Sequence, residues 1–404
     1  MRYARKTRDN GLCRLLDNVP GYGQLAGVRD SRALSRAPAV NSRGLAADLA
    51  HHAAMPEDRY PWLEDQVVRT QLAEVETLPS KSACVGGAPA ELHDQLLSTR
   101  SKRIRPAILL LCARFGARAP SNQLVEAAAA LEQVHEATLY HDDIVDRSDM
   151  RRGTPSVQRA LGPAAAAFVG SDLLYASAYL CARMPARIHR EIAITAQTLC
   201  RGQMREVERV GDEFLGIPVR IRTMAAKTAS LFRLAARMGE MLAGVPRPAM
   251  RALDRFAMRF GLCFQLADDL RDIVGTCKSL GRAPRRDLWD GVYTLPVLFA
   301  LQRDAQVGGR LSEVLQALRA HPEEAMLYQA AVLVRELGGL ERSREVLAAW
   351  VARARVELEA LTQNQAQPVK RSLHGLLTVV ASAFGGDAGP GASAKPFEDY
   401  MGRC

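Results

Sequence analysis

Residues 121–146 read SNQLVEAAAALEQVHEATLYHDDIVD, an apolar run that ends on the acidic cluster His141-Asp142-Asp143-Ile144-Val145-Asp146. The spacing of its apolar residues predicts a helix over this run. Asp142 and Asp146 are four positions apart, so their carboxylates project from one helix face, one turn apart. Like charges at that spacing destabilise an isolated helix by roughly a few tenths of a kcal/mol. The sequence therefore predicts a compensating cation beside this end of the helix.

A second cluster repeats the spacing. Gln265-Leu266-Ala267-Asp268-Asp269-Leu270-Arg271-Asp272 places Asp268 and Asp272 four positions apart. Magnesium prefers oxygen ligands and shares its octahedron between a few carboxylates, waters and substrate phosphates. Either cluster alone could be an acidic helix end at a solvated surface. Two copies, each followed by basic residues, favour a magnesium-dependent site.

Helical patterns extend outward from the two clusters over most of the chain. Aromatic residues make up only 5% of the sequence, Ala and Leu are abundant, and β-branched runs are few. This composition favours helices over sheet, and Gly and Pro separate the segments. The predicted helices cover residues 62–77, 89–99, 103–117, 121–146, 155–160, 163–183, 187–209, 218–243, 247–274, 293–302, 311–319, 322–336, 340–362 and 367–384. We therefore predict an all-α fold.

The chain divides into three predicted regions. Residues 59–384 form one helical domain, and residues 385–404, rich in Gly, Ala and Pro, form a flexible tail. Residues 1–58 carry many arginines without sustained periodicity and are predicted to be a poorly ordered basic tail. That tail could instead be an Arg-rich targeting peptide, or the true start could lie near Met55.

Composition limits the class of partner and the compartment. The formal net charge of +10 and the isoelectric point near 9.4 fit either a solvated basic surface or a field for a phosphorylated substrate, an anionic membrane or nucleic acid. No zinc-finger spacing or RNA-binding motif is present, so no nucleic-acid partner is expected. The eight cysteines are scattered without a Cys-x-x-Cys pair, which is typical of a reducing compartment. With no signal-peptide core and no apolar run near 18 residues, we expect a cytoplasmic protein with at most peripheral membrane contact.

Basic residues near the acidic clusters predict anion binding. Lys102-Arg103-Ile104-Arg105-Pro106 opens a helix, where backbone N–H groups already favour an anion. Each basic site could be an ordinary surface charge. Together with the two clusters they would form a cage for two diphosphates, one held through metal and one held directly. The further basic residues of this kind are Arg151, Arg152, Lys227, Arg282, Arg285 and Arg286.

The run from Lys102 to Pro296 resembles the trans-isoprenyl (polyprenyl) diphosphate synthase family. The matching motifs are Ser148-Asp149-Met150-Arg151-Arg152-Gly153, Lys227-Thr228, Phe264 to Asp272 and Thr294-Leu295-Pro296. The resemblance covers roughly residues 60–384. It implies a large helical bundle of the isoprenoid synthase type with a central active-site cavity, and a homodimer.

The resemblance also implies a role for each candidate residue. About three Mg²⁺ ions would be bound by Asp142, Asp146 and Asp268, with Asp143, Asp269 and Asp272 as neighbouring carboxylates. An allylic diphosphate would be held by Arg151, Lys227 and Arg282, and isopentenyl diphosphate by Lys102, Arg105, His135 and Arg152. The Lys227 carbonyl, the Thr228 hydroxyl and the Gln265 amide oxygen would surround the allylic cation. His135, with Ala, Val and Leu neighbours, could instead be a satisfied core histidine.

The implied reaction is a head-to-tail condensation of isopentenyl diphosphate with an allylic diphosphate. Ala137 and Thr138, four or five positions before Asp142, would lie at the floor of the product pocket, and their small size favours a product longer than farnesyl. A class I terpene cyclase is one rival reading, but the second Asp-Asp-x-x-Asp cluster argues against it. A non-catalytic subunit of a heteromeric synthase is another, although all six aspartates are retained.

Several positions depart from the family pattern. Ser98 to Ser101 stand in place of glycines, and Arg282 and Val292 replace lysines. Gln203 and Glu206 stand where Glu and Gln are expected, in that order. These differences bear on substrate binding and leave the aspartate clusters intact.

Overall fold

The computed structural model describes residues 62–78, 103–119, 121–151, 154–275, 284–361 and 367–382. All of these residues lie inside the predicted helical domain. The predicted helix at 89–99 and the two predicted tails lie outside the described residues, so the boundaries of the domain remain a prediction.

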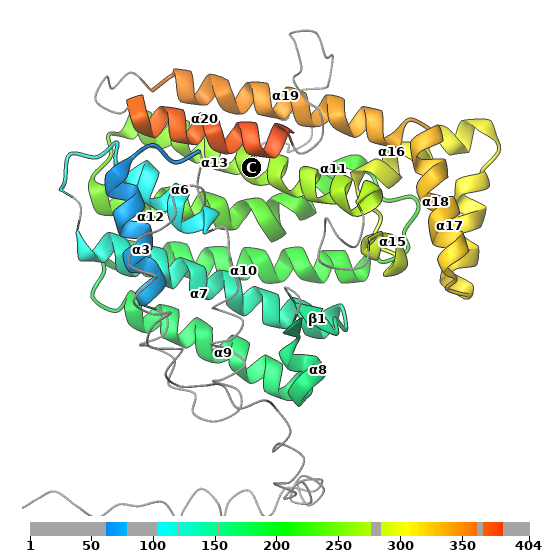
Figure 1. Cartoon of the computed structure of the whole chain (residues 1–404), viewed down its shortest axis with the longest axis horizontal. Coiled ribbons are helices and arrows are strands. Elements are labelled where there is room, and N and C mark those ends of the chain that lie inside the picture. The colour runs from blue at the N-terminus through cyan, green and yellow to red at the C-terminus, as the bar shows by residue number, and fades with distance from the viewer. Residues whose placement is uncertain are drawn as a thin grey trace, which may run out of the picture. The chain divides into compact units, whose positions relative to one another are not determined.

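The described residues are almost entirely helical, which confirms the all-α prediction (Figure 1). The helices are α3 (Gln66–Thr77), α6 (Ile104–Ala113), α7 (Asn122–Val145), α8 (Val157–Leu161), α9 (Pro163–Leu180), α10 (Ala186–Glu208), α11 (Ile217–Met224), the π-helical turn η4 (Ala225–Ala229), α12 (Ser230–Ala243), α13 (Arg247–Val274), α15 (Arg286–Trp289), α16 (Leu295–Val307), α17 (Arg310–Ala320), α18 (Glu324–Glu336), α19 (Gly339–Glu359) and α20 (Gln367–Ser382). A two-residue hairpin, β1 (Met150–Arg151) and β2 (Thr154–Pro155), was not predicted. None of these helices combines the length and apolar character needed to cross a membrane.

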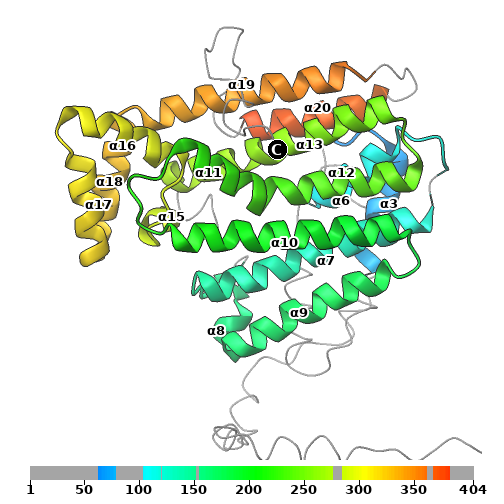
Figure 2. The same cartoon turned by 180° about the vertical axis from the view of Figure 1, so that it is seen from behind.

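The long helices stack so that α7, α10, α12 and α13 lie between α9 at one edge and α19 with α20 at the other (Figure 1 and Figure 2). Helix α7 packs on α9 and α6, and α13 packs on α12 and α19. The two aspartate clusters therefore lie on two inner helices, α7 and α13, each of which is packed between other helices of the bundle.

The inner helices pack closely through buried aromatic rings and through a glycine. Phe232 of α12 and Phe260 of α13 are fully buried and meet edge to face, with ring centroids 5.2 Å apart. Gly239 of α12 faces α6, where an added Cβ would come within 2.1 Å of the Leu109 carbonyl oxygen. An alanine at this glycine would push α6 away from α12, so close packing of the inner layer requires the glycine.

The predicted helix over 218–243 is interrupted by the π-helical turn η4. The turn places one extra residue in the helix, and such turns occur frequently at functional sites. Gly202 of α10 faces this turn, and a Cβ there would lie 2.8 Å from the backbone nitrogen of Lys227. Helix α10 can therefore lie directly against the turn that carries Lys227 and Thr228.

Glu240 of α12 should make the free energy of unfolding depend on pH. Its side chain is only 1% exposed, and burial, aided by Asp254 and opposed by Arg237 and Arg233, raises its pKa from 4.5 to about 8. Because the folded pKa exceeds the unfolded pKa, the folded state favours the protonated form. The free energy of unfolding should therefore fall as the pH rises from about 4.5 to about 8.

Glu240→Gln should remove this loss. We expect its free energy of unfolding at pH 8.5 to exceed that of the wild type by roughly 1–3 kcal/mol, with little difference at pH 5. Urea unfolding at the two pH values measures the effect. Glu341→Gln, at an exposed position of α19, is the control and should change neither value. An equal effect of Glu240→Gln at both pH values would contradict the prediction.

Candidate active site

The first aspartate cluster lies at the carboxyl end of α7, where Asp142 and Asp146 are half-buried. Burial raises the pKa of Asp142, and the nearby Lys227 and Arg151 oppose the rise. Burial also raises the pKa of Asp146, to about 6, again against the effect of Lys227. The helix end thus concentrates carboxylates whose charge is incompletely compensated, which is the environment expected for a cation site.

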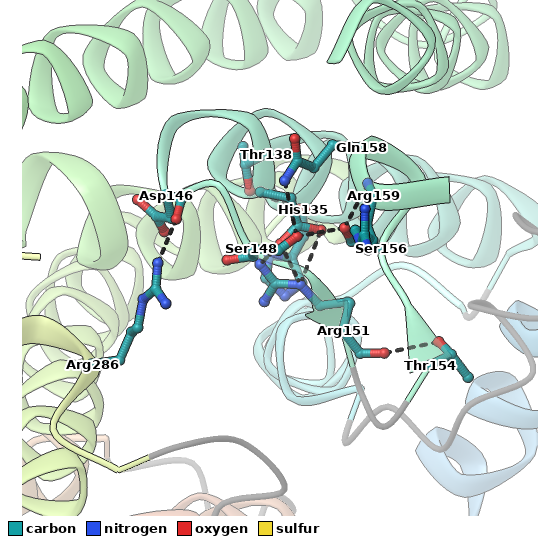
Figure 3. Close-up of polar contacts among 11 residues, drawn as sticks. His135, Thr138, Asp146, Ser148, Arg151, Thr154, Ser156, Gln158, Arg159 and Arg286 are labelled. Atoms are coloured by element: carbon teal, nitrogen blue, oxygen red, sulfur yellow. Dashed lines mark hydrogen bonds and ion pairs between the residues drawn. The ribbon is translucent and has the colours of Figure 1, made fainter. Parts of the chain in front are cut away.

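Asp143 is buried and forms an ion pair with Arg151. The Arg151 Nε lies 3.0 Å from Oδ1 and 3.3 Å from Oδ2 of Asp143, and Nη2 donates to Oδ1 as well. The β1–β2 hairpin folds back to make this contact and is fixed by Ser156, whose hydroxyl donates to the Ser148 carbonyl at 2.5 Å. Asp143 therefore anchors the hairpin and orients Arg151. Figure 3 shows Arg151 on this hairpin, where its carbonyl accepts from the Thr154 hydroxyl.

Arg286 of α15, which lies far along the sequence from α7, contacts the same end of that helix. Its Nη2 donates to the Asp146 carbonyl at 2.7 Å, while its Nε donates to Asp290 at 2.7 Å. Figure 3 shows this side chain reaching Asp146 apart from the hairpin that holds Arg151. The sequence predicted Arg286 only as one of the basic residues of a diphosphate cage, and its contact with Asp146 was not predicted.

The second cluster lies near the carboxyl end of α13 and is divided by exposure. Asp268 is exposed, whereas Asp269 and Asp272 are each only 1% exposed. Asp269 accepts from Gln265 Nε2 at 2.8 Å, and burial raises its pKa to about 6 against the effect of Arg220. Asp272 accepts from the backbone N–H of Asp287 at 3.1 Å. Only Asp268 of the three is open to a metal or substrate.

Exposure therefore separates the six aspartates in the way that the sequence resemblance implies. Asp142, Asp146 and Asp268, the expected metal ligands, are the more accessible three. The expected neighbouring carboxylates Asp143, Asp269 and Asp272 are buried in contacts with protein groups. This agreement supports the assigned roles, which remain predictions.

Lys227 and Thr228 occupy the π turn η4 and connect the two clusters. Lys227 interacts electrostatically with Asp142 and Asp146 of the first cluster. The Thr228 hydroxyl donates to the Gln265 amide oxygen at 2.6 Å, and Gln265 adjoins the second cluster. The turn thus brings two of the groups expected around an allylic cation, the Thr228 hydroxyl and the Gln265 amide oxygen, into contact.

Two residues that hold Lys227 in place were not assigned to the site from the sequence. Lys227 Nζ donates to Glu206 of α10 at 2.5 Å, and Arg220 of α11 donates to the other oxygen of Glu206 at 2.6 Å. The sequence marks Glu206 only as a departure from the family pattern, and it gives no prediction for Arg220. An isolated arginine on an amphipathic helix gives no signal that distinguishes it from a surface charge.

The residues expected to hold isopentenyl diphosphate are described only in part. Lys102, Arg152 and Arg282, the last of them assigned to the allylic diphosphate, lie outside the described residues. Arg105 is half-buried, and its guanidinium lies 4.5 Å from the ring centroid of Phe232. His135 is half-buried, and its carbonyl accepts from the Thr138 hydroxyl at 2.7 Å.

The two residues predicted at the pocket floor differ in environment. Ala137 is fully buried among side chains of α7, α8 and α9, such as Val157, Val169 and Leu173. Thr138 is half-buried. Four positions along a helix correspond to about 40° and five to about 140°, so Thr138 lies closer than Ala137 to the face that carries Asp142.

A hard divalent cation fits the donor set of this site. Asp142, Asp146 and Asp268 offer carboxylate oxygens, and the first two are carboxylates whose pKa is raised. Among the described residues, no three His, Cys, Asp or Glu side chains converge on a ready-made metal position. Magnesium, which keeps several water or phosphate ligands and needs few from protein, suits such an open arrangement.

Comparison with known proteins places the chain among prenyl synthases. A family model described as polyprenyl synthetase matches residues 89–332. The chain is 33% identical to nonaprenyl diphosphate synthase of Mycobacterium tuberculosis, over 80% of this chain and 91% of that protein. It is 32% identical to heptaprenyl diphosphate synthase component 2 of Geobacillus stearothermophilus, over 78% of this chain and 95% of that protein.

Solved structures show the same fold. A polyprenyl synthase from Caulobacter crescentus, complexed with calcium and isoprenyl diphosphate, aligns with a TM-score of 0.74 and 28% identity, over 81% of this chain and 98% of that chain. A decaprenyl diphosphate synthase from Rhodobacter capsulatus aligns with a TM-score of 0.73 and 26% identity, over 81% of this chain and 99% of that chain. The helical bundle is therefore the isoprenoid synthase fold.

Proposed function

Since this chain belongs to the polyprenyl synthetase family and is a trans-polyprenyl diphosphate synthase, we propose that it condenses isopentenyl diphosphate with an allylic diphosphate in a Mg²⁺-dependent reaction. One observation carries the proposal. The π turn η4 lies between the two aspartate clusters, with Lys227 facing Asp142 and Asp146 and with Thr228 bonded to Gln265. Cations for a leaving diphosphate and oxygens for a carbocation therefore adjoin each other.

Each protein group has a defined task in this reaction. When bound to Asp142, Asp146 and Asp268, about three Mg²⁺ ions would neutralise the charge that develops on the leaving pyrophosphate. Lys227 and Arg151 bind the same diphosphate and stabilise that charge directly. The carbonyl of Lys227, the Thr228 hydroxyl and the Gln265 amide oxygen stabilise the positive charge left on the allylic carbons. The isopentenyl double bond attacks that cation, and the departing pyrophosphate takes the proton released at the end.

The second substrate is assigned to the amino end of α6. Arg105, half-buried over Phe232, and His135 of α7 are the described residues proposed to hold isopentenyl diphosphate. Lys102 and Arg152 are proposed to complete that site from outside the described residues. The Caulobacter polyprenyl synthase is complexed with both calcium and isoprenyl diphosphate, which supports a divalent cation that acts through the diphosphate.

We further propose that the protein is a homodimer. Phe168, Tyr175 and Tyr179 of α9 are each at least 76% exposed. Their spacing of seven and four places them along one helix face, as an apolar surface that a second copy would cover. One relative carries the name of a component of a synthase, so a different partner chain is the alternative occupant of this face.

The deciding experiment is elongation by the purified protein. It is incubated with Mg²⁺, isopentenyl diphosphate and allylic primers of several lengths, and the products are sized. Elongation of at least one primer is expected. A cyclic hydrocarbon made from a single diphosphate would favour a terpene cyclase. No product from any primer, until a partner chain is added, would favour a non-catalytic subunit.

Ala137→Phe should shorten the longest product. The new ring would extend from the side of α7 that packs on α8 and α9, along which a growing prenyl chain is proposed to pass. Overpacking a fully buried site also costs about 1–3 kcal/mol of stability. Product sizing by chromatography therefore accompanies a melting curve. Ala354→Phe, at an equally buried position of α19, controls for overpacking and should leave product length unchanged. An unchanged product distribution in Ala137→Phe would remove Ala137 from the pocket.

A further inference from the structure

A closed set of polar contacts surrounds the π turn η4. Lys227 Nζ donates to Glu206 Oε1 at 2.5 Å, and Arg220 Nη1 donates to Glu206 Oε2 at 2.6 Å. Glu206 therefore bridges two cations, one on η4 and one on α11. Arg220 and Lys227 lie on the consecutive segments α11 and η4, whereas Glu206 lies on α10, so their contacts hold the turn against α10.

The contacts continue from Arg220 back to the turn. Arg220 Nη2 lies 3.7 Å from Asp269 Oδ2, and Gln265 Nε2 donates to Asp269 Oδ1 at 2.8 Å. Gln265 in turn accepts from the Thr228 hydroxyl at 2.6 Å. We call these residues the polar ring: Lys227, Glu206, Arg220, Asp269, Gln265 and Thr228. It begins at Lys227 and ends at its neighbour Thr228, and Arg220 connects its two halves.

Within the polar ring, Arg220 compensates the negative charge of Glu206. Glu206 stays ionised: burial alone would raise its pKa, but Arg220 and Lys227 outweigh burial and hold it at about 2. An ionised carboxylate paired with Lys227 alone would cancel the charge that a diphosphate needs. Arg220 is only 4% exposed and brings a second positive charge to the same carboxylate. Lys227, Arg220 and Glu206 together carry one net positive charge, which the Asp269 carboxylate, 3.7 Å from Arg220, offsets only in part.

We propose that Arg220 is a positioning residue for the prenyl transfer. Arg220 neutralises Glu206, so that Glu206 can orient Lys227 without cancelling the charge that Lys227 presents to the allylic diphosphate. The inference rests on the proposed function, in which Lys227 binds that diphosphate. Arg220 itself is bound to the Glu206 oxygen that Lys227 does not contact. Its contact with Asp269 couples the orientation of Lys227 to the second aspartate cluster.

A second buried carboxylate in the same protein provides a matched comparison. Glu357 of α19 is held by Arg259 at 2.6 Å and by Arg255 at 2.7 Å. Arg259 is buried as Arg220 is, while the Arg255 side chain, 50% exposed, is more open than that of Lys227 at 26%. This pair joins α13 to α19, outside the proposed site. It separates the general cost of leaving a carboxylate unpaired from a specific effect on substrate binding.

The test is a double-mutant cycle read through the KM for an allylic diphosphate, such as geranylgeranyl diphosphate, and through kcat. Arg220→Met should raise that KM about tenfold or more, because Glu206 then neutralises Lys227. Glu206→Gln should keep the KM within about threefold of the wild type and lower kcat modestly, since the amide can still accept from Lys227. The double variant should return the KM to the value of Glu206→Gln, although it lacks two groups rather than one.

Melting temperatures and control variants distinguish this role from a structural one. Arg259→Met should lower the melting temperature about as much as Arg220→Met and leave the KM within twofold of the wild type. An Arg220→Met enzyme that is folded and keeps the wild-type KM would overturn the proposal. So would a double variant whose KM exceeds that of Glu206→Gln by tenfold, and this comparison holds even if Arg220→Met does not fold.

The failure of this inference can be told apart from failure of the proposed function. If the wild type elongates primers, the function stands and the variants judge Arg220 alone. If the wild type gives no product, the same comparison is made with the Kd of geranylgeranyl diphosphate in the presence of Mg²⁺, measured by calorimetry. Equal Kd values for the wild type and Arg220→Met would then reject the inference.

Discussion

Replacing Asp142 by alanine should lower the turnover number about 100-fold or more, the scale associated with losing one group that stabilises the transition state. Asp142 lies at the end of α7 with Asp146 one turn away, and the half-buried pair faces the Lys227 cation. Removing one carboxylate would weaken the binding of the cation that neutralises the leaving pyrophosphate. Asp268→Ala should have an effect of the same order, because Asp268 is the accessible carboxylate of the second cluster.

Single-turnover rates with saturating isopentenyl diphosphate measure this loss without the contribution of product release. Glu341→Ala, which removes an exposed carboxylate of α19, is the control and should retain wild-type turnover. Raising the Mg²⁺ concentration should recover part of the activity of Asp142→Ala if weaker metal binding is the cause. Turnover of Asp142→Ala or Asp268→Ala within threefold of the wild type would argue against their role as ligands.

Removal of divalent cations should abolish elongation. The proposed ligand set contains only carboxylate oxygens, and the leaving pyrophosphate carries more charge than Lys227 and Arg151 can neutralise alone. The expected result is activity at the background level after dialysis against EDTA, with recovery when MgCl₂ is added. Product formation is followed with labelled isopentenyl diphosphate. Full activity in the presence of excess chelator would refute the metal dependence.

A binding measurement makes the metal prediction independent of turnover. An allylic diphosphate should raise the melting temperature strongly when Mg²⁺ is present and weakly in EDTA, because metal and diphosphate share one coordination sphere. Mg²⁺ alone should have little effect, since the described carboxylates do not converge on a ready-made position. A large stabilisation by Mg²⁺ without diphosphate would point to a preformed metal site instead.

Most of the helical fold could be predicted because its helices are long and regularly punctuated. The predicted segment 121–146 corresponds to α7 at Asn122–Val145, and 247–274 corresponds to α13 at Arg247–Val274. The β1–β2 hairpin escaped prediction because side-chain contacts hold it rather than a strand-period pattern, such as that of Arg151 with Asp143. The π turn within 218–243 also escaped prediction, and it lies against Gly202 of another helix.

The candidate site also contains some features that could be predicted from the sequence and others that could not. Aspartates four positions apart carry a local signal, so both clusters were found from spacing alone. The partners of Lys227 and Asp146 carry no such signal: Glu206 lies 21 positions before Lys227, and Arg286 lies 140 positions after Asp146. Which aspartate of each cluster is accessible also depends on groups brought by other elements, as with Arg151 of β1 for Asp143. Periodicity cannot supply such pairings, because they exist only after the helices pack.

The π turn η4 has one consequence for how this sequence can change. A turn that holds one residue more than an α-helix offsets the helical phase of α12 against that of α11 by about 100°. Loss of a single residue between Ala225 and Ala229 would leave a continuous hydrogen-bonded helix, yet it would rotate every side chain on one side of the turn by that angle. Phe232 would then leave the core, or Arg220 would turn from Glu206. Chain length in these five residues is therefore constrained more tightly than residue identity, and alterations here should be confined to substitutions.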